Sequence, residues 1–77
     1  MMMDDHDIRA CIRTILKDGP NDVPTITKII YPEMPYYNRS HRQTKIRHHL
    51  VKMERDGEVT HTPGERNGAV TIWRLRE

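Results

Sequence analysis

The sequence is poor in several residue types that small domains commonly use. It contains no phenylalanine, its aromatic share is 5%, and it has one cysteine among 77 residues. A single cysteine excludes a disulfide within the chain, and no paired-thiol spacing for a structural zinc site exists, so the composition favours a reducing compartment. The core is therefore expected to consist mainly of Ile, Leu, Val and Met.

Long hydrophobic runs are also missing. No apolar stretch approaches the ~20 residues that span a bilayer. The N-terminal methionines precede acidic residues, unlike the basic and then apolar layout of a signal peptide. We therefore expect a cytoplasmic, nucleoid-associated protein with no membrane partner, forming a single domain over 1–77 without room for a separate catalytic or effector domain.

Acidic residues are absent from one part of the chain. The formal net charge is only +2, yet residues 38–53 contain five lysines and arginines and no aspartate or glutamate. The first seven residues, by contrast, contain Asp4, Asp5 and Asp7. This separation of charge predicts that one face of the protein is positive.

Apolar residues recur at helical spacing in three segments, which glycines and prolines separate. The spacing predicts helices over about 5–18, 24–31 and 38–55. The apolar stripes expected to face the core are Ile8, Cys11, Ile12, Ile15 and Leu16, then Ile26, Ile29 and Ile30, then Ile46, Leu50 and Met53. After Gly57, β-branched and alternating residues predict strands over about 58–62 and 69–75, joined by a turn over 63–68. Trp73 and Leu75 are expected to cap the helical core from the second strand.

This order of elements resembles the winged helix-turn-helix superfamily of transcription regulators. The most specific part is "IRHHLVKMERDGEV", which resembles the end of that family's recognition helix, and "TIWRLRE" is similar to its last strand. The resemblance implies an α+β fold, a winged helix of three helices followed by a two-stranded β-hairpin wing. It also implies double-stranded DNA as partner, with residues 38–51 in the major groove and the wing tip at 63–68 on the neighbouring minor groove or backbone. The segment "YPEMPYYN" is longer and richer in Pro and Tyr than the family's usual turn. The sequence contains no family motif for effector or metal sensing, so it assigns no subfamily.

The candidate DNA contacts lie mainly in the first half of the third helix. Arg, Gln, Ser and Thr are side chains that read base edges, and Lys and Arg neutralise phosphates. The candidates are Arg39, Ser40, His41, Arg42, Gln43, Thr44, Lys45, Arg47 and His48, with Arg66 at the hairpin tip. At 100° per residue, Arg39 and Arg42 project inward, whereas His41, Thr44, Lys45 and His48 face outward.

The same residues are compatible with other functions. The basic helix face is also compatible with a solvated surface, with a protein-interaction adaptor or with an RNA-binding domain. A homodimer is possible, as in many small DNA-binding proteins. The five histidines lack the spacing and the carboxylate or thiol partners of a metal site. No catalytic, cofactor-binding or small-molecule effector motif can be assembled, so neither enzymatic activity nor a cofactor is expected.

Overall fold

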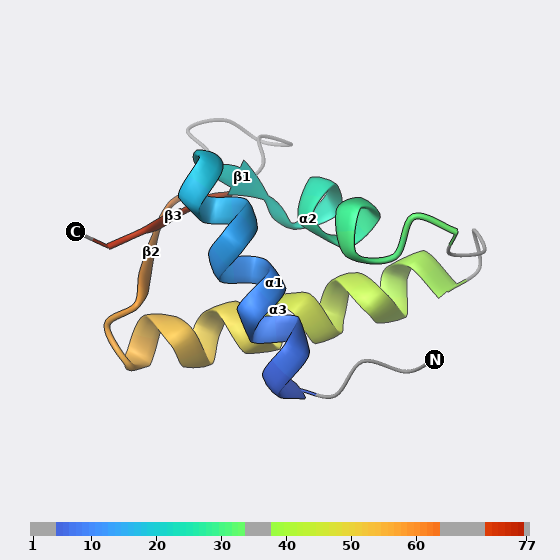
Figure 1. The fold of residues 1–77 in the computed structure, drawn as a ribbon, viewed down its shortest axis with the longest axis horizontal. Coiled ribbons are helices and arrows are strands. Elements are labelled where there is room, and N and C mark those ends of the chain that lie inside the picture. Colours follow the sequence, from blue (N-terminus) through green and yellow to red (C-terminus); the bar gives the residue numbers. More distant parts are fainter. Residues whose placement is uncertain (1–4, 34–37, 64–70, 77) are drawn as a thin grey trace.

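The computed structural model describes residues 5–33, 38–63 and 71–76. Along these residues the order is α1, β1, α2, α3, β2, β3, and the three strands form one antiparallel sheet. Figure 1 shows α1 crossing in front of α3, with α2 beside the first half of α3 and the sheet at the other end. The predicted α+β class is confirmed.

Helix α1 (Asp5–Asp18) has the predicted bounds. Asp5 and Asp7 lie in its first turn and Lys17 lies in its last, which matches the sign of the helix dipole at both ends. Its buried residues Ile8, Ile12 and Leu16 follow one another at four-residue intervals. Both the terminal charges and the apolar stripe thus specify this helix locally.

Helix α2 (Val23–Ile30) begins one residue earlier and ends one residue earlier than the prediction of 24–31. Asp22 caps its start, because the Asp22 carboxylate accepts a hydrogen bond from the Thr25 backbone N–H at 2.8 Å. The helix ends before Tyr31 because Pro32 disfavours helical angles at the preceding residue. Helix α3 (Arg39–Arg55) follows, close to the predicted 38–55, with Asn38 at its N-cap position.

The predicted two-stranded hairpin accounts for only part of the sheet, which has three strands over the described residues. Strand β2 (Val59–Thr62) pairs with β3 (Ile72–Leu75), and β3 also pairs with β1 (Asn21–Asp22), giving the order β1-β3-β2. In register, Asn21 lies opposite Trp73 on one side of β3, and His61 lies opposite it on the other. A two-residue strand carries no alternation of its own, so only its long-range pairing defines it. Of the second predicted strand, residues 69 and 70 lie outside the described residues.

The core joins all three helices to the sheet. It consists of Ile8, Ile12, Leu16, Val23, Ile26, Ile46, Leu50, Met53, Val59 and Trp73. The predicted capping role is confirmed, because Trp73 is buried and Leu75 packs against the core from the same face of β3.

Four residues predicted for the core lie nearer the surface. Ile29 is 52% exposed, and Cys11, Ile15 and Ile30 are half-buried. Together with Ala10 and Thr14 they line an open groove between α1 and α2. Helix α2 is only eight residues long, and its isoleucines lie on more than one side. The groove arises because α1 and α3 do not cover all of these sides.

Candidate nucleic-acid interface

Helix α3 has a buried side and an exposed side. Ile46, Leu50 and Met53 are fully buried, as predicted, and His49 is buried beside them. The opposite side is open to solvent and carries Ser40, His41, Thr44, Arg47, His48, Val51 and Lys52. Arg39, which helical spacing predicts to project inward, is exposed at the start of the helix. Lys45 is half-buried at the border between the two sides. The exposed side is therefore cationic and rich in hydrogen-bonding groups.

The hydroxyl of Thr44 is already engaged within the helix. Its Oγ1 donates a hydrogen bond to the Ser40 carbonyl at 3.0 Å. The oxygen keeps its acceptor capacity and the methyl group stays exposed, so Thr44 offers both an acceptor and an apolar contact to a partner.

Arg42 and Gln43 turn toward α2, away from the exposed side. The guanidinium carbon of Arg42 lies 4.6 Å from the centroid of the Tyr31 ring, and both residues are half-buried. Gln43 is half-buried against α2. Helical spacing predicts that Arg42 points inward, and the structure shows that its partner there is Tyr31, at the C-cap of α2.

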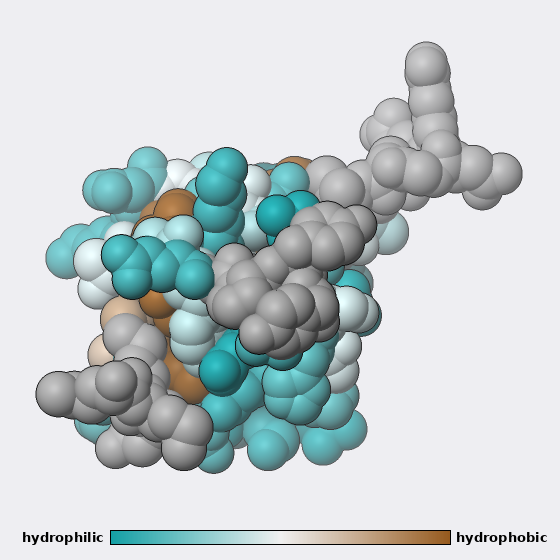
Figure 2. Space-filling model, turned by 90° about the vertical axis from the view of Figure 1, so that its right-hand side faces the viewer, coloured by the Kyte–Doolittle hydropathy of each residue, from teal (hydrophilic) through white to brown (hydrophobic). Residues whose placement is uncertain are grey.

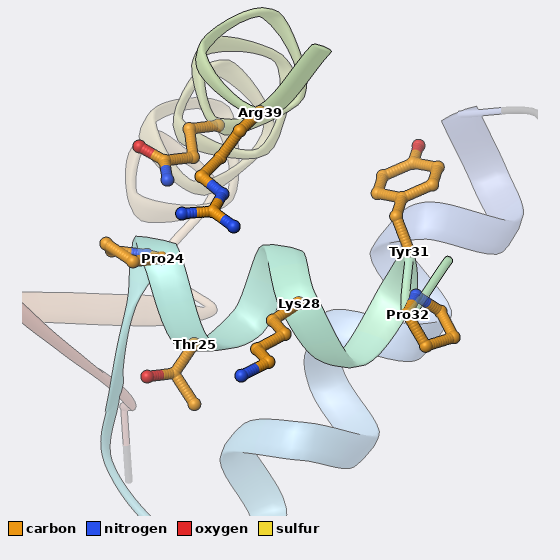
Figure 3. Close-up of a pocket in the computed structure, with 7 residues that line it drawn as sticks. Pro24, Thr25, Lys28, Tyr31, Pro32 and Arg39 are labelled. Carbon is orange, nitrogen blue, oxygen red and sulfur yellow. The ribbon is translucent and has the colours of Figure 1, made fainter. Parts of the chain in front are cut away.

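A cleft separates the first turns of α3 from α2 (Figure 3). Its lining is Pro24, Thr25, Lys28, Tyr31, Pro32, Arg39 and Gln43. Figure 3 shows Arg39 reaching from α3 toward Pro24 at the start of α2, while Lys28 extends from the middle of that helix. Among the described residues, this lining contains two cations, Lys28 and Arg39, and no acidic residue. The cleft thereby extends the cationic surface of α3 onto α2.

The sequence interpretation missed Lys28 and Thr25 as candidates. Their signal was weak, because a single lysine and threonine on a short helix resemble any solvated surface. Only the packing of α2 beside α3 brings them into the lining of the same cleft as Arg39. Figure 2, which views the side that carries the start of α3 and the end of α2 in Figure 1, shows a mainly hydrophilic surface with smaller hydrophobic areas.

The second half of α3 lies against the sheet. Arg47, Val51 and Glu54 line a groove with His61 and Trp73. His61 Nδ1 lies 2.6 Å from the Glu54 carboxylate, and its ring packs against Trp73 at a tilt of 40°, with centroids 4.8 Å apart. These contacts fix β2 relative to α3. The predicted contact Arg66 and the rest of the hairpin tip over 64–68 lie outside the described residues.

His49 has a structural position between α1 and α3. Arg9 Nε donates a hydrogen bond to His49 Nδ1 at 3.3 Å, and His49 Nε2 lies 3.4 Å from the Asp5 carboxylate. Because arginine only donates, Nδ1 accepts and the ring proton resides on Nε2, facing Asp5. Burial lowers the pKa of His49, and the cations Arg9, Lys45 and Lys52 add to this, while Asp5 opposes it.

Within the described residues, no group of three or more His, Cys, Asp and Glu side chains is arranged to hold a metal ion. In the same residues, no helix combines the length and the apolar character needed to cross a membrane. The comparisons with protein-family models and with curated proteins found no match.

Proposed function

We propose that this chain binds double-stranded DNA as a winged-helix domain, with the exposed side of α3 in the major groove. The observation that carries the proposal is the exposed side of α3. Its cations are accompanied by no acidic residue from 38 to 53, and its buried stripe anchors the helix to the core. A helix fits the major groove of B-DNA, and lysine and arginine near phosphates gain affinity by releasing condensed counterions.

The position of each side chain on α3 and α2 suggests its role in the proposed interface. His41, Thr44 and His48 face outward and are the proposed base-reading residues, flanked by Ser40 and Arg47. Lys45 and Arg47 are the proposed phosphate contacts, and Lys28 and Arg39 extend this contact to a backbone strand beside α2. The hairpin tip over 63–68, with Arg66, remains the proposed contact to the adjacent groove. The proposed role is regulation of transcription by occupying DNA.

The dependence of affinity on salt tests the proposal. If about six cations neutralise phosphates, log affinity should fall with log salt at a slope of about −5 on B-DNA, and removing one contact should flatten the slope by about one. We expect Lys45→Ala and Arg47→Ala to do so. Lys17→Ala is the matched control, because Lys17 is an exposed cation in the last turn of α1. Absence of duplex binding even at low salt would overturn the proposal.

A protein-interaction adaptor is the second candidate. The observation that favours it is the apolar groove between α1 and α2, where Ile29 is 52% exposed beside Cys11 and Ile15. The groove offers a place for an apolar side chain of another protein, whether a different chain or a second copy in a homodimer. Sedimentation of the wild type and of Ile29→Ser, alone and with candidate partners, separates the two functions. Adaptor association should be lost in Ile29→Ser, whereas duplex affinity should persist.

Double-stranded RNA is a weaker alternative partner. The deep, narrow major groove of A-form RNA does not admit a helix, although its phosphates attract the same cations. Duplex DNA and duplex RNA of equal length and sequence should therefore differ in affinity at the same salt concentration. Equal affinity would indicate binding through charge alone.

A further inference from the structure

Arg42 differs from the other cations of α3 in its surroundings. Arg39, Arg47 and Lys52 are exposed, and Lys45 is half-buried. Arg42 is half-buried too, and its guanidinium lies over the ring of Tyr31 at 4.6 Å. A guanidinium within about 6 Å of a ring centroid is attracted to the negative face of the ring. Arg42 is therefore committed to a contact inside the protein.

Tyr31 is itself held firmly. It packs against the hydrophobic core, and its backbone N–H donates to the Thr27 carbonyl at 2.8 Å at the end of α2. Thr27 is fully buried. The ring beneath Arg42 is thus a fixed point on the core, and the contact joins the end of α2 to the first turns of α3.

The first turns of α3 have little local support. Asn38 makes no side-chain capping hydrogen bond, and the first turn contains no acidic residue. Its basic residues lie at the positive end of the helix dipole, where cations are unfavourable. Tertiary contacts must therefore hold this end of the helix, and the Arg42–Tyr31 contact is placed to do so.

We infer that Arg42 is a positioning residue, which orients the DNA-reading end of α3 by packing on Tyr31 and does not contact DNA itself. The inference rests on the proposed DNA-binding function. On this inference, Arg42 is not one of the direct DNA contacts that the sequence alone suggests. Tyr31, which would not touch DNA, would then affect the affinity for DNA through its contact with Arg42.

The test compares variants on both sides of the contact. Arg42→Met keeps the aliphatic length and removes the charge, Tyr31→Leu removes the ring, and Tyr31→Phe keeps the ring as the matched control. Each of the first two should weaken duplex affinity about three- to tenfold, the usual scale of a partly buried cation–π contact, while the salt slope stays unchanged. The double variant should be no weaker than the single ones, and Tyr31→Phe should bind like the wild type.

A second measurement reports on the helix itself. Hydrogen exchange at the backbone N–H groups of residues 43–46 should accelerate in Arg42→Met and Tyr31→Leu but not in Tyr31→Phe, with the melting of the whole domain as the check on folding. If Arg42→Met flattens the salt slope by about one while Tyr31→Leu leaves affinity unchanged, Arg42 is a phosphate contact and the inference is wrong. If the wild type binds no duplex, the proposed function fails, and the exchange data still decide whether the contact positions α3.

Discussion

Neighbouring residues of α3 differ sharply in what they contribute. Leu50 is fully buried in the core, whereas the side chain of Val51, the next residue, is 39% exposed to solvent. Adjacent helical positions point about 100° apart, so the two side chains lie on different sides of one helix. Stability and recognition can therefore be altered separately on α3.

Replacing Leu50 with Ala should lower the free energy of unfolding by about 2–5 kcal/mol, because it leaves a cavity in the core. Val51→Ala is the matched control and should cost well under half of that. Ile15→Ala should also cost less than Leu50→Ala, since Ile15 is half-buried. Chemical denaturation of the three variants measures the differences. Equal losses for Leu50→Ala and Val51→Ala would show that the sides of α3 are assigned wrongly.

The buried His49 should make stability depend on pH. Its pKa is lowered from the ordinary 6.5, mainly by burial, so the unfolded chain binds a proton at a higher pH than the folded one. The unfolded state then holds more protons between the two pKa values, and stability falls as pH decreases below about 6.5. Protonation of Nδ1 would also place an N–H against the donating Arg9 side chain.

Denaturation at several pH values between about 5 and 8 tests this dependence. His49→Gln should flatten the profile over this range, whereas His48→Gln should leave it unchanged, because His48 is exposed on the other side of the helix. The charged groups that face His49 are Asp5 and Arg9 from α1 and Lys45 and Lys52 from α3. If stability depends on pH in the same way in His49→Gln and in the wild type, His49 is not the source of the pH dependence.

At the scale of elements, the end of α3 is defined by backbone geometry and by a contact to α1. Gly57 has φ +82°, and the N–H of Glu58 bonds to the Met53 carbonyl at 2.9 Å. The Glu58 carboxylate accepts two hydrogen bonds from Arg13, at 2.8 and 3.2 Å, and this partner lowers the pKa of Glu58. The turn thus leads the chain into β2, which packs against α3 and pairs with β3.

Gly57→Ala should destabilise the protein by about 1–2 kcal/mol, because an L-residue is strained at this positive φ. No atom lies within 4 Å of an added Cβ, so the loss would come from the backbone and not from a clash. Gly57→Asn should lose less, because asparagine tolerates left-handed angles better than alanine does. Thermal melts rank the two variants, and an Ala variant as stable as wild type would contradict this account.

The sequence predicted well those helices and strands whose bounds depend on residues close together in the chain. The charges and the four-residue spacing of α1 predicted its bounds, and the alternation around Trp73 predicted the inner face of β3. Strand β1 was missed because its two residues are defined only by pairing with β3, far away in the sequence. Ile29 was misplaced because the spacing within α2 does not say which side the neighbouring helices cover. At the candidate site, helical spacing predicted the exposed side. The pairing of Arg42 with Tyr31 and the cleft that Lys28 and Arg39 both line depend on how α2 packs against α3.

At the scale of the whole molecule, charge and shape make different contributions to the proposed binding. The cations around α3 and α2 would attract any duplex, because phosphate contacts carry no direct sequence information. Discrimination between sequences would come from the outward side chains near the start of α3, which the core and the end of α2 hold in place. The two contributions should respond differently to substitution.

Selection from random duplex DNA should therefore enrich a defined sequence, and Thr44→Ala should relax the preference at one position by about 1–3 kcal/mol. The salt slope of this variant should match the wild type, because Thr44 carries no charge, whereas Lys45→Ala should flatten the slope and keep the preferred sequence. These two substitutions affect neighbouring residues, so they form a matched pair on one turn of α3. Titrations of selected and scrambled duplexes at several salt concentrations measure both quantities. If the wild type binds both duplexes equally, α3 binds phosphates without reading bases, and the proposed regulator is reduced to a binder of DNA in general.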